Sequence, residues 1–194
     1  GFGFEGSSIR AWAVISESDM LLIPDPQSAY VDPFLAIPTL VLYCDVRDPI
    51  TKQEYARDPR GIAKKAQAYL NNTGIADTAY FGAEAEFFIF DNIRFDTTTE
   101  KSYYFIDSDE GRWNSGKEGE NKGYHPRYKE GYFPVPPTDH YMDLRGEMVQ
   151  IMLGCGLHVE CQHHEVASGG QAEIDLRFDT LLRHADHMMM YKYI

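Results

Sequence analysis

The sequence predicts an α+β fold, because strand patterns and helix patterns both recur along its 194 residues. Residues 11–46 and 79–90 are rich in β-branched and aromatic side chains, which favours strands. Residues 58–70 show the capping residues of a helix, and residues 139–155 show the apolar spacing of one. A hydrophobic content of 43% is ample for the core of one or two domains.

The first part of the chain is expected to place strands ahead of a helix. Turns are predicted at residues 25–26 and 32–33, where aspartate precedes proline, and residues 39–44 are predicted as a buried strand. A helix is predicted from Pro59 to about Leu70, because Asp58 suits the N-cap and proline suits the first helical position.

The rest of the chain alternates strands, a long loop and helices. The predicted elements are a buried strand at residues 79–90, a strand at 102–107, a loop at 111–137, a helix at 139–155 and a last helix from Asp179. A loop as long as the one predicted here is usually functional or mobile in a compact domain.

Two pairs of glutamates are the most informative residues of the chain. Glu84 and Glu86 lie two positions apart in the predicted strand at residues 79–90, so they share one face of it. Two carboxylates about 7 Å apart beside large apolar residues are costly unless a cation binds them. The alternatives are ion pairs with distant arginines, or a wet sheet edge.

The second pair, Glu165 and Glu173, flanks a tight-turn signal at residues 168–170. With those three residues as the loop, Glu165 faces Glu173, and like charges opposed across a ladder destabilise it. His163 and Asp175 fall on the same face in this register. The cluster indicates a divalent ion or a shared proton, unless the hairpin is simply acidic and exposed.

The residue types of this cluster favour Mg²⁺ or Mn²⁺ over zinc or copper, because carboxylates dominate and at most one histidine is near. Cys44, Cys155 and Cys161 show no C-x-x-C spacing, so a thiolate site is not predicted. Cys161 is interpreted as a small core residue. Three unpatterned cysteines fit a reducing compartment, which predicts a cytoplasmic protein.

The charge balance argues against two classes of partner. Thirty acidic residues against eighteen basic ones give a net charge of −12, which disfavours binding to nucleic acid or to an anionic membrane. The sequence contains no run of eighteen apolar residues and opens with no signal-peptide pattern. We therefore expect neither a nucleic acid nor a membrane as partner.

Several motifs strongly resemble bacterial type I glutamine synthetase and follow the order found in that family. They are Gly-Ser-Ser-Ile at residues 6–9, Glu-Ser-Asp-Met at 17–20, Pro-Asp-Pro at 24–26, Gly-Ala-Glu-Ala-Glu-Phe-Phe at 82–88, Gly-Tyr-Phe-Pro-Val-Pro-Pro at 131–137 and His-His-Glu-Val-Ala-Ser-Gly-Gly-Gln-Ala-Glu at 163–173. The resemblance runs from the first residue to the last.

This resemblance implies two domains. Residues 1–55 would be the C-terminal part of a β-grasp N-terminal domain. Residues 56–194 would be the first part of the catalytic domain, an antiparallel sheet curved into a partial barrel with flanking helices, which binds ATP and metal.

The reaction that the resemblance implies is the ATP-dependent ligation of ammonia to L-glutamate, which gives L-glutamine through γ-glutamyl phosphate. Two or more Mg²⁺ or Mn²⁺ ions per site are implied, because glutamate and ATP are both anionic and the pocket is built of glutamates. The implied partners are L-glutamate, ammonium, ATP and further copies of the chain. These copies would form a ring-based homo-oligomer, a dodecamer, with sites shared between subunits.

The resemblance implies roles for the acidic residues. Glu86, Glu165 and Glu173 match the ligands of the metal nearer the glutamate substrate. Glu84 matches a ligand of the second metal, which holds the nucleotide phosphates.

Three further residues match the nucleotide site: Glu160, His163 near the ATP phosphates, and Phe178 against the adenine. Strand parity puts Glu160 on the face opposite Glu165, so its role requires a bulge or a strand end.

The ammonium site departs from the family pattern. Its carboxylate is usually the aspartate of an Asp-Gly-Ser-Ser motif from the neighbouring subunit, and this chain has Glu5 there. The extra methylene keeps the charge but lengthens the reach by about one bond, which affects positioning. Asp19 matches a second acid of this region, and Tyr132 matches the tyrosine of the pocket. A carboxylate there would hold the cation and accept its proton.

Two other functions stay open at this point. One is a related ligase that acts on another amine, such as a polyamine. The other is a non-catalytic structural homologue, although such a protein would have no reason to tolerate opposed carboxylates.

The family pattern continues beyond Ile194 with a histidine and a carboxylate for the second metal and with arginines that bind glutamate and phosphate. We therefore expect residues 1–194 by themselves to form no glutamine. The measurement is ATP- and ammonium-dependent turnover of the purified 194-residue segment, with the whole protein as positive control. Robust turnover by the segment would contradict the expectation.

Overall fold

The computed structural model describes residues 1–14, 18–114, 118–119 and 123–194, so one residue of the motif at 17–20, Glu17, lies outside the described residues. The described residues form two compact units, Gly1–Gly82 with Phe178–Ile194, and Ala83–Arg177. Every paired strand in them is antiparallel. The predicted α+β fold is confirmed, and the described sheets form no closed barrel.

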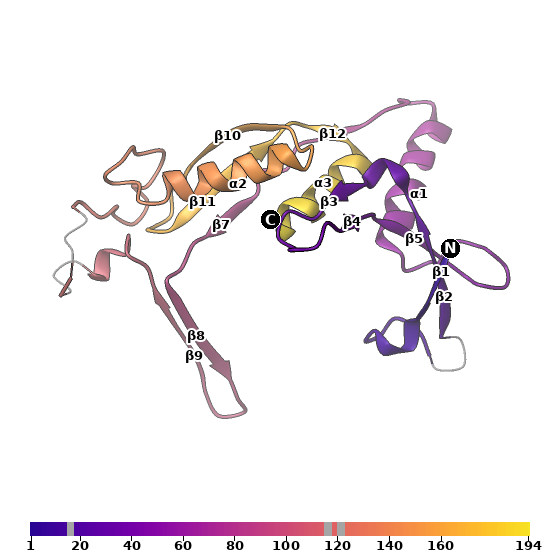
Figure 1. Cartoon of the computed structure of the whole chain (residues 1–194), viewed down its shortest axis with the longest axis horizontal. Helices are drawn as coiled ribbons and strands as arrows, with labels where there is room; N and C mark the ends of the chain where they lie inside the picture. The colour runs from indigo at the N-terminus through magenta and orange to yellow at the C-terminus, as the bar shows by residue number, and fades with distance from the viewer. Residues whose placement is uncertain (15–17, 115–117, 120–122) are drawn as a thin grey trace. The chain divides into compact units, whose positions relative to one another are not determined.

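The first unit contains short strands and two helices. Its strands are β1 (Phe2–Glu5), β2 (Asp19–Pro24), β3 (Tyr30–Val31), β4 (Leu40–Val41), β5 (Cys44–Arg47), β6 (Tyr80–Phe81) and β12 (Asp179–Thr180), and its helices are α1 (Pro59–Thr73) and α3 (Leu181–Tyr193). β2 lies between β1 and β5 in a three-stranded sheet, while β3 pairs with β4 and β6 with β12 (Figure 1).

Helix α1 confirms the predicted capping. The Asp58 carboxylate accepts the N–H of Arg60 at 3.1 Å, and Pro59 is the first helical residue. The helix continues to Thr73, three residues beyond the expected end, because Gly74 supplies the left-handed C-cap with φ 70°.

Arg60 on α1 joins three carboxylates of the first unit. Its guanidinium lies 2.7 Å from Asp25, 2.5 Å from Asp45 and 2.9 Å from Asp186 on α3. Because the side chain of Arg60 is 11% exposed, these charge-assisted bonds are partly desolvated and bind strand ends to both helices.

Two strand predictions for the N-terminal part were wrong. Residues 39–44 are not one buried strand: Leu40–Val41 pairs with β3, and the chain changes partner before Cys44–Arg47 pairs with β2. Residues 11–14 form no strand, while β1 lies earlier than predicted. In both places the partner strand, which the local pattern does not contain, decided the outcome.

The second unit carries the candidate site. Its elements are β7 (Glu86–Phe88), β8 (Asn92–Thr97), β9 (Ser102–Asp107), α2 (Met142–Gly154), β10 (Val159–His164) and β11 (Gln171–Leu176). β11 is the central strand between β10 and β7, and α2 packs along β10 and β11 (Figure 1). Met152 of α2 is fully buried with Ala172 and Ile174 of β11, so one sheet face is core.

The predicted buried strand at residues 79–90 is two short strands, β6 and β7, with exposed glutamates. β6 pairs with β12, whereas β7 pairs with β11, so the chain changes partner between them. The predicted alternation is confirmed, since Glu84 and Glu86 are exposed while Ala83, Ala85 and the residue after Glu86 are more buried.

Helix α2 begins at Met142, three residues after the predicted start of the helix at Asp139. The carboxylate of Asp139 instead accepts from Arg145 Nη1 at 3.1 Å, and both side chains are 1% exposed. Arg145 also donates to Gln162 on β10 at 2.6 Å. Asp139 therefore belongs to a buried ion pair and lies outside the helix.

The remaining predictions were close to the structure. The strand at 102–107 is β9, paired with β8, which was not predicted. The loop at 111–137 contains the short helix η4 (Arg112–Asn114) in its described residues, and the last helix begins two residues after Asp179. The other short helices are η1 (Gly6–Ser8) and η3 (Pro26–Ser28). No helix of the described residues is long and apolar enough to cross a membrane.

Candidate metal centre

Strands β10 and β11 bring the predicted ligands together on one face of the sheet. Glu165, which directly follows β10, joins His163 and Glu173, and each offers a ligand atom within 4.8 Å of the other two. His163 Nδ1 lies 3.5 Å from Glu165 Oε1, and His163 Nε2 lies 3.6 Å from Glu173 Oε2. Both glutamates are only 6% exposed, so the structure confirms the predicted clustering.

The predicted register was wrong by two residues. Glu173 lies opposite His163 rather than Glu165, and the Glu165 N–H donates to the Gln171 carbonyl at 3.0 Å. A shift of two residues leaves every side chain on its predicted face, so the cluster survives the change.

The loop between β10 and β11 is longer than the three residues predicted, because the residues that follow β10 pair with another segment of the chain. Gly131 donates its N–H to the Val166 carbonyl at 3.3 Å, and Phe133 donates to the His164 carbonyl at 3.0 Å. The segment after β10 therefore pairs with residues 129–133 instead of closing a short hairpin.

The directly opposed like charges lie across the ladder between β11 and β7, not across the ladder between β10 and β11. Glu173 is the register partner of Glu86 on β7, and Gln171 Nε2 donates to Glu86 Oε2 at 2.5 Å. Three of the four predicted glutamates thus belong to one connected surface. Glu84 lies two residues before Glu86 on the same exposed side, outside β7.

The electrostatics of Glu173 fit a bound cation. Its Oε1 atom is buried and has no hydrogen-bond partner among the described residues. Burial, with the neighbouring Asp175 and Glu165 carboxylates, raises the pKa of Glu173 to about 7. A hard divalent ion such as Mg²⁺ or Mn²⁺ would satisfy this orphaned oxygen and compensate the charges, so the residues present fit the predicted group.

Tyr132 lies beside the metal cluster. Its ring packs edge-on against His163, with centroids 5.4 Å apart and an interplanar angle of 85°. The tyrosine is 57% exposed, so it borders the cluster and faces solvent. The preceding residue is a glycine because its backbone lies against that of Glu165: a Cβ on Gly131 would lie 2.7 Å from the Glu165 carbonyl oxygen.

The two outer nucleotide residues are exposed and lie in different units. β10 has an irregularity between Val159 and Cys161, which leaves Glu160 as the extra residue of a bulge and meets the condition stated for its role. Phe178 belongs to the first unit, is 52% exposed and packs edge-on against Tyr80 at 5.5 Å.

Glu5 and Asp19 also meet, in the first unit. They are register partners at the ends of β1 and β2, and both are exposed. Hydrogen bonds from Ser7 and Ser18 lower the pKa of Glu5, which keeps this carboxylate ionised.

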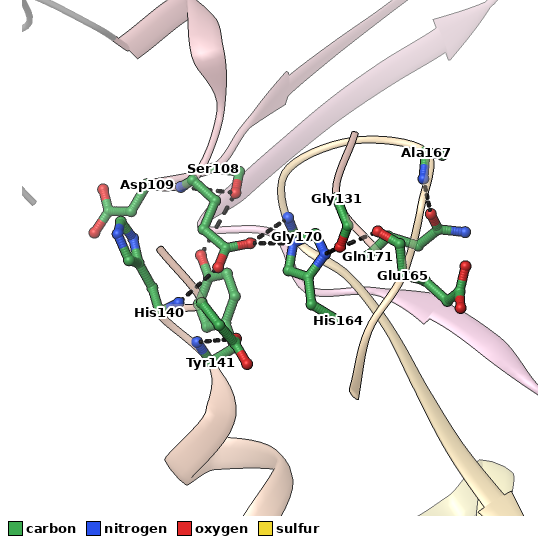
Figure 2. A network of polar contacts seen from close by, with 12 residues as sticks. Ser108, Asp109, Gly131, His140, Tyr141, His164, Glu165, Ala167, Gly170 and Gln171 are labelled. Carbon is green, nitrogen blue, oxygen red and sulfur yellow. Dashed lines mark hydrogen bonds and ion pairs between the residues drawn. The ribbon is translucent and has the colours of Figure 1, made fainter. Parts of the chain in front are cut away.

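Sequence reasoning missed a buried pair behind the cluster, Glu110 and His164 (Figure 2). Both side chains are 0% exposed, and His164 Nε2 lies 2.9 Å from Glu110 Oε2. The other oxygen of Glu110 accepts the His140 N–H at 2.7 Å, and Oε2 also accepts the Gly170 N–H at 2.6 Å. No periodic pattern marks Glu110, which lies in the predicted loop.

The contacts of His164 indicate an imidazolium ion. Its Nδ1 faces the carbonyl oxygens of Gly131 at 2.6 Å and Glu165 at 2.8 Å, which only accept, while Nε2 faces a carboxylate (Figure 2). Burial opposes both charges, but their mutual hydrogen bond raises the pKa of His164 and lowers the pKa of Glu110. Through the carbonyl groups of Gly131 and Glu165, this ion pair positions the backbone next to Tyr132 and at Glu165.

Comparisons with known proteins match the whole chain. The family model described as the glutamine synthetase catalytic domain matches residues 56–194, and the glutamine synthetase beta-Grasp domain matches residues 1–49. A glutamine synthetase of Frankia alni is 58% identical over 196 residues, and one of Aquifex aeolicus is 55% identical over 194. All of this chain is covered in both, but only 41% of each relative.

Solved structures agree at the level of the fold. A Plasmodium falciparum glutamine synthetase superposes with a TM-score of 0.86 at 28% identity, over 100% of this chain and 38% of that one. An unliganded GmaS superposes with a TM-score of 0.70 at 20% identity, which shows the fold alone.

The buried ion pair should be required for stability. The lowered pKa of Glu110 contributes stability above its ordinary value of 4.5, and the raised pKa of His164 contributes stability below its ordinary value of 6.5. Between these values both contributions are present; they are lost as the pH falls through the folded pKa of Glu110 or rises through that of His164. We expect Glu110→Gln to lower the free energy of unfolding by about 3–5 kcal/mol in this window.

Urea unfolding of the whole protein at several pH values measures this effect. Glu130→Gln is the matched control, because Glu130 is exposed and its ion pair with the exposed Arg127 has an N–O distance of 3.7 Å. Equal losses in the two variants, or a Glu110→Gln loss that does not change with pH, would show that the charged pair is not the cause.

We expect the Glu173 carboxylate to lower the stability of the metal-free protein and to raise the stability when a metal ion is bound. Because its folded pKa is raised to about 7, the folded protein keeps a proton that the unfolded chain releases above 4.5, so the stability falls as pH rises between these values. We expect Glu173→Gln to raise the thermal midpoint of the metal-free protein above pH 7 by about 2 °C or more, and to remove the stabilisation by Mn²⁺.

Thermal melts with Mn²⁺ and with a chelator test this expectation. Glu147→Gln, on the exposed side of α2, should change neither melt. A lower metal-free midpoint in Glu173→Gln, together with an unchanged response to Mn²⁺, would sink the assignment of Glu173 as a ligand.

Proposed function

The chain belongs to the glutamine synthetase family, and on this premise we propose that the whole protein joins ammonia to L-glutamate at the expense of ATP. The product is L-glutamine, formed through γ-glutamyl phosphate. The chain spans about two fifths of the length of its curated relatives, so the proposal concerns the protein of which it is a part.

The observation that carries the proposal is the unsatisfied acidic cluster. Glu165 and Glu173 are buried side by side, and one buried oxygen of Glu173 finds no hydrogen-bond partner in the part of the chain that the structure describes. A protein with no cation to hold would lose stability from such an arrangement. The cluster therefore supports the ligase over a non-catalytic homologue.

We assign Glu86, Glu165 and Glu173 to the ion nearer the glutamate substrate and Glu84 to the second ion. The ions would be Mg²⁺ or Mn²⁺, and when bound they would neutralise the repulsion between ATP and the substrate carboxylate. The glutamine side chain of residue 171 orients Glu86 through its 2.5 Å hydrogen bond, so this carboxylate is held toward the cluster before any ion arrives.

The nucleotide is assigned to Glu160, His163 and Phe178. The bulge at Glu160 supports its role because the extra residue changes the direction in which the side chain leaves the strand. The exposed ring of Phe178 has an aromatic neighbour on one side and offers surface to a base. His163 would donate a hydrogen bond to a phosphate oxygen.

Ammonium is assigned to Tyr132, Glu5 and Asp19. The low pKa of Glu5 keeps a negative charge that attracts the cation, and the same carboxylate would accept the proton that ammonium loses. Glu5 and Asp19 are opposed across β1 and β2, so a cation between them would also relieve their repulsion.

We further propose the organisation implied by the family. Residues 1–55 would complete a β-grasp domain and residues 56–194 would open the catalytic domain. The whole protein would be a cytoplasmic dodecamer of stacked rings, with Glu5 supplied to the site of a neighbouring subunit.

The test is phosphate release from ATP by the whole protein, measured with L-glutamate and a panel of amines. We expect release to require L-glutamate and ammonium, and Glu165→Gln to lower it by more than about 100-fold, because a ligand carboxylate is lost. The exposed variant Glu147→Gln is the control and should keep the full rate.

Two outcomes contradict the proposal. A preference for a polyamine over ammonium would identify a related ligase of different specificity. Full activity of Glu165→Gln would show that the acidic cluster is not the metal centre.

A further inference from the structure

A second group of ligating atoms lies on the same sheet face, one register step from the acidic cluster. Cys161 on β10 is the register partner of Asp175 on β11, and its Sγ–H donates to Asp175 Oδ2 at 3.0 Å. Together with His163, these residues offer three ligand atoms that all lie within 4.8 Å of one another. The sheet therefore places a thiol, an imidazole and a carboxylate side by side.

Cys161 is not the small core residue that the sequence suggested. It is exposed, and it shares the ligand face of the sheet because it lies two residues before His163 in the regular part of β10. Ions in solution thus have direct access to the sulfur atom.

Asp175, whose carboxylate adjoins that of Glu173, gives a further sign of an absent cation. While its Oδ2 atom accepts from Cys161, its Oδ1 atom is buried and has no hydrogen-bond partner among the described residues. An unpaired carboxylate oxygen out of contact with water is costly, and a cation would remove this cost.

The chemistry of the three donors differs from that of the acidic cluster. Sulfur, nitrogen and oxygen donors together suit zinc, which takes three protein ligands and leaves a fourth position to water. Ligand atoms around zinc lie roughly 3.5 Å apart, so the group would have to contract only slightly. Mg²⁺ prefers oxygen donors and would not take this set.

We propose that Cys161, His163 and Asp175 form a site for a thiophilic divalent cation such as Zn²⁺, distinct from the carboxylate site. The bound ion replaces the Sγ–H proton, which leaves to solvent, and takes both the thiolate and the carboxylate of the present hydrogen bond. His163 also lies in the acidic cluster, 3.5 Å from Glu165 and 3.6 Å from Glu173, but the ligands assigned to the first hard ion are the glutamates, so the ring can serve the second site. Zinc bound here withdraws this ring from the nucleotide role proposed for it.

Co²⁺ tests the site, because it replaces Zn²⁺ and reports a sulfur ligand through a thiolate-to-cobalt absorption band in the near ultraviolet. The whole protein is titrated with Co²⁺ in saturating Mg²⁺, which occupies the oxygen sites. We expect about one sulfur-ligated Co²⁺ per chain that Zn²⁺ displaces and Mg²⁺ does not. The spectrum requires no ligase activity, so it is informative even if the proposed function is wrong.

Variants assign the band to these residues. Cys161→Ala should abolish it, and Asp175→Asn should weaken Co²⁺ binding by more than about 10-fold. Cys155→Ser is the matched control and should keep the band. A band that persists in Cys161→Ala, or the absence of any band in the unsubstituted protein, overturns the proposal.

A measurement on the unsubstituted protein covers the case in which a variant fails to fold. Alkylation of Cys161 by iodoacetamide, followed by peptide mass mapping, should slow at least about 10-fold in Zn²⁺ and be unchanged in Mg²⁺. Equal alkylation rates with and without Zn²⁺ would rule the site out.

Discussion

The candidate site depends on one buried interaction, the contact between the His164 imidazolium and the Glu110 carboxylate. It lies behind the ligand face and bonds four backbone groups as well, including those of Gly131 and Gly170. Because neither charge can reach water, the loop after β10 has little freedom to rearrange. The positions of Glu165 and Tyr132 follow from this restraint.

The ligand face itself is unfavourable without cations. β11 carries Glu173 and Asp175 next to each other on one face, with Glu86 opposite Glu173 on β7. Their mutual repulsion is tolerated because the core face of the same strand buries Ala172 and Ile174 completely. Hydrophobic burial on one side thus holds together carboxylates that would otherwise separate, which is the arrangement that a metal centre requires.

Local patterns predicted much of this structure where the relevant interactions are local. Asp58 and Pro59 marked the start of α1, and strand parity together with the role implied for Glu160 called for a bulge or a strand end, which the structure supplies as a bulge. Patterns failed where distant partners decided the outcome. Residues 79–90 became two strands with different partners, and Asp139 paired with Arg145 ahead of α2 instead of beginning the helix. Glu110 had no local signal at all, since its burial arises from contacts more than 25 residues away along the chain.

The sequence by itself determined which side chains share a face, because the two-residue period of a strand is a property of the backbone. His163, Glu165, Glu173 and Asp175 were on one surface whichever even register the hairpin took. Only the tertiary structure decided the register, because the segment at 129–133 competes for the backbone after β10. That competition placed His163 opposite Glu173 and Cys161 opposite Asp175, and so separated an oxygen-rich cluster from one that contains sulfur.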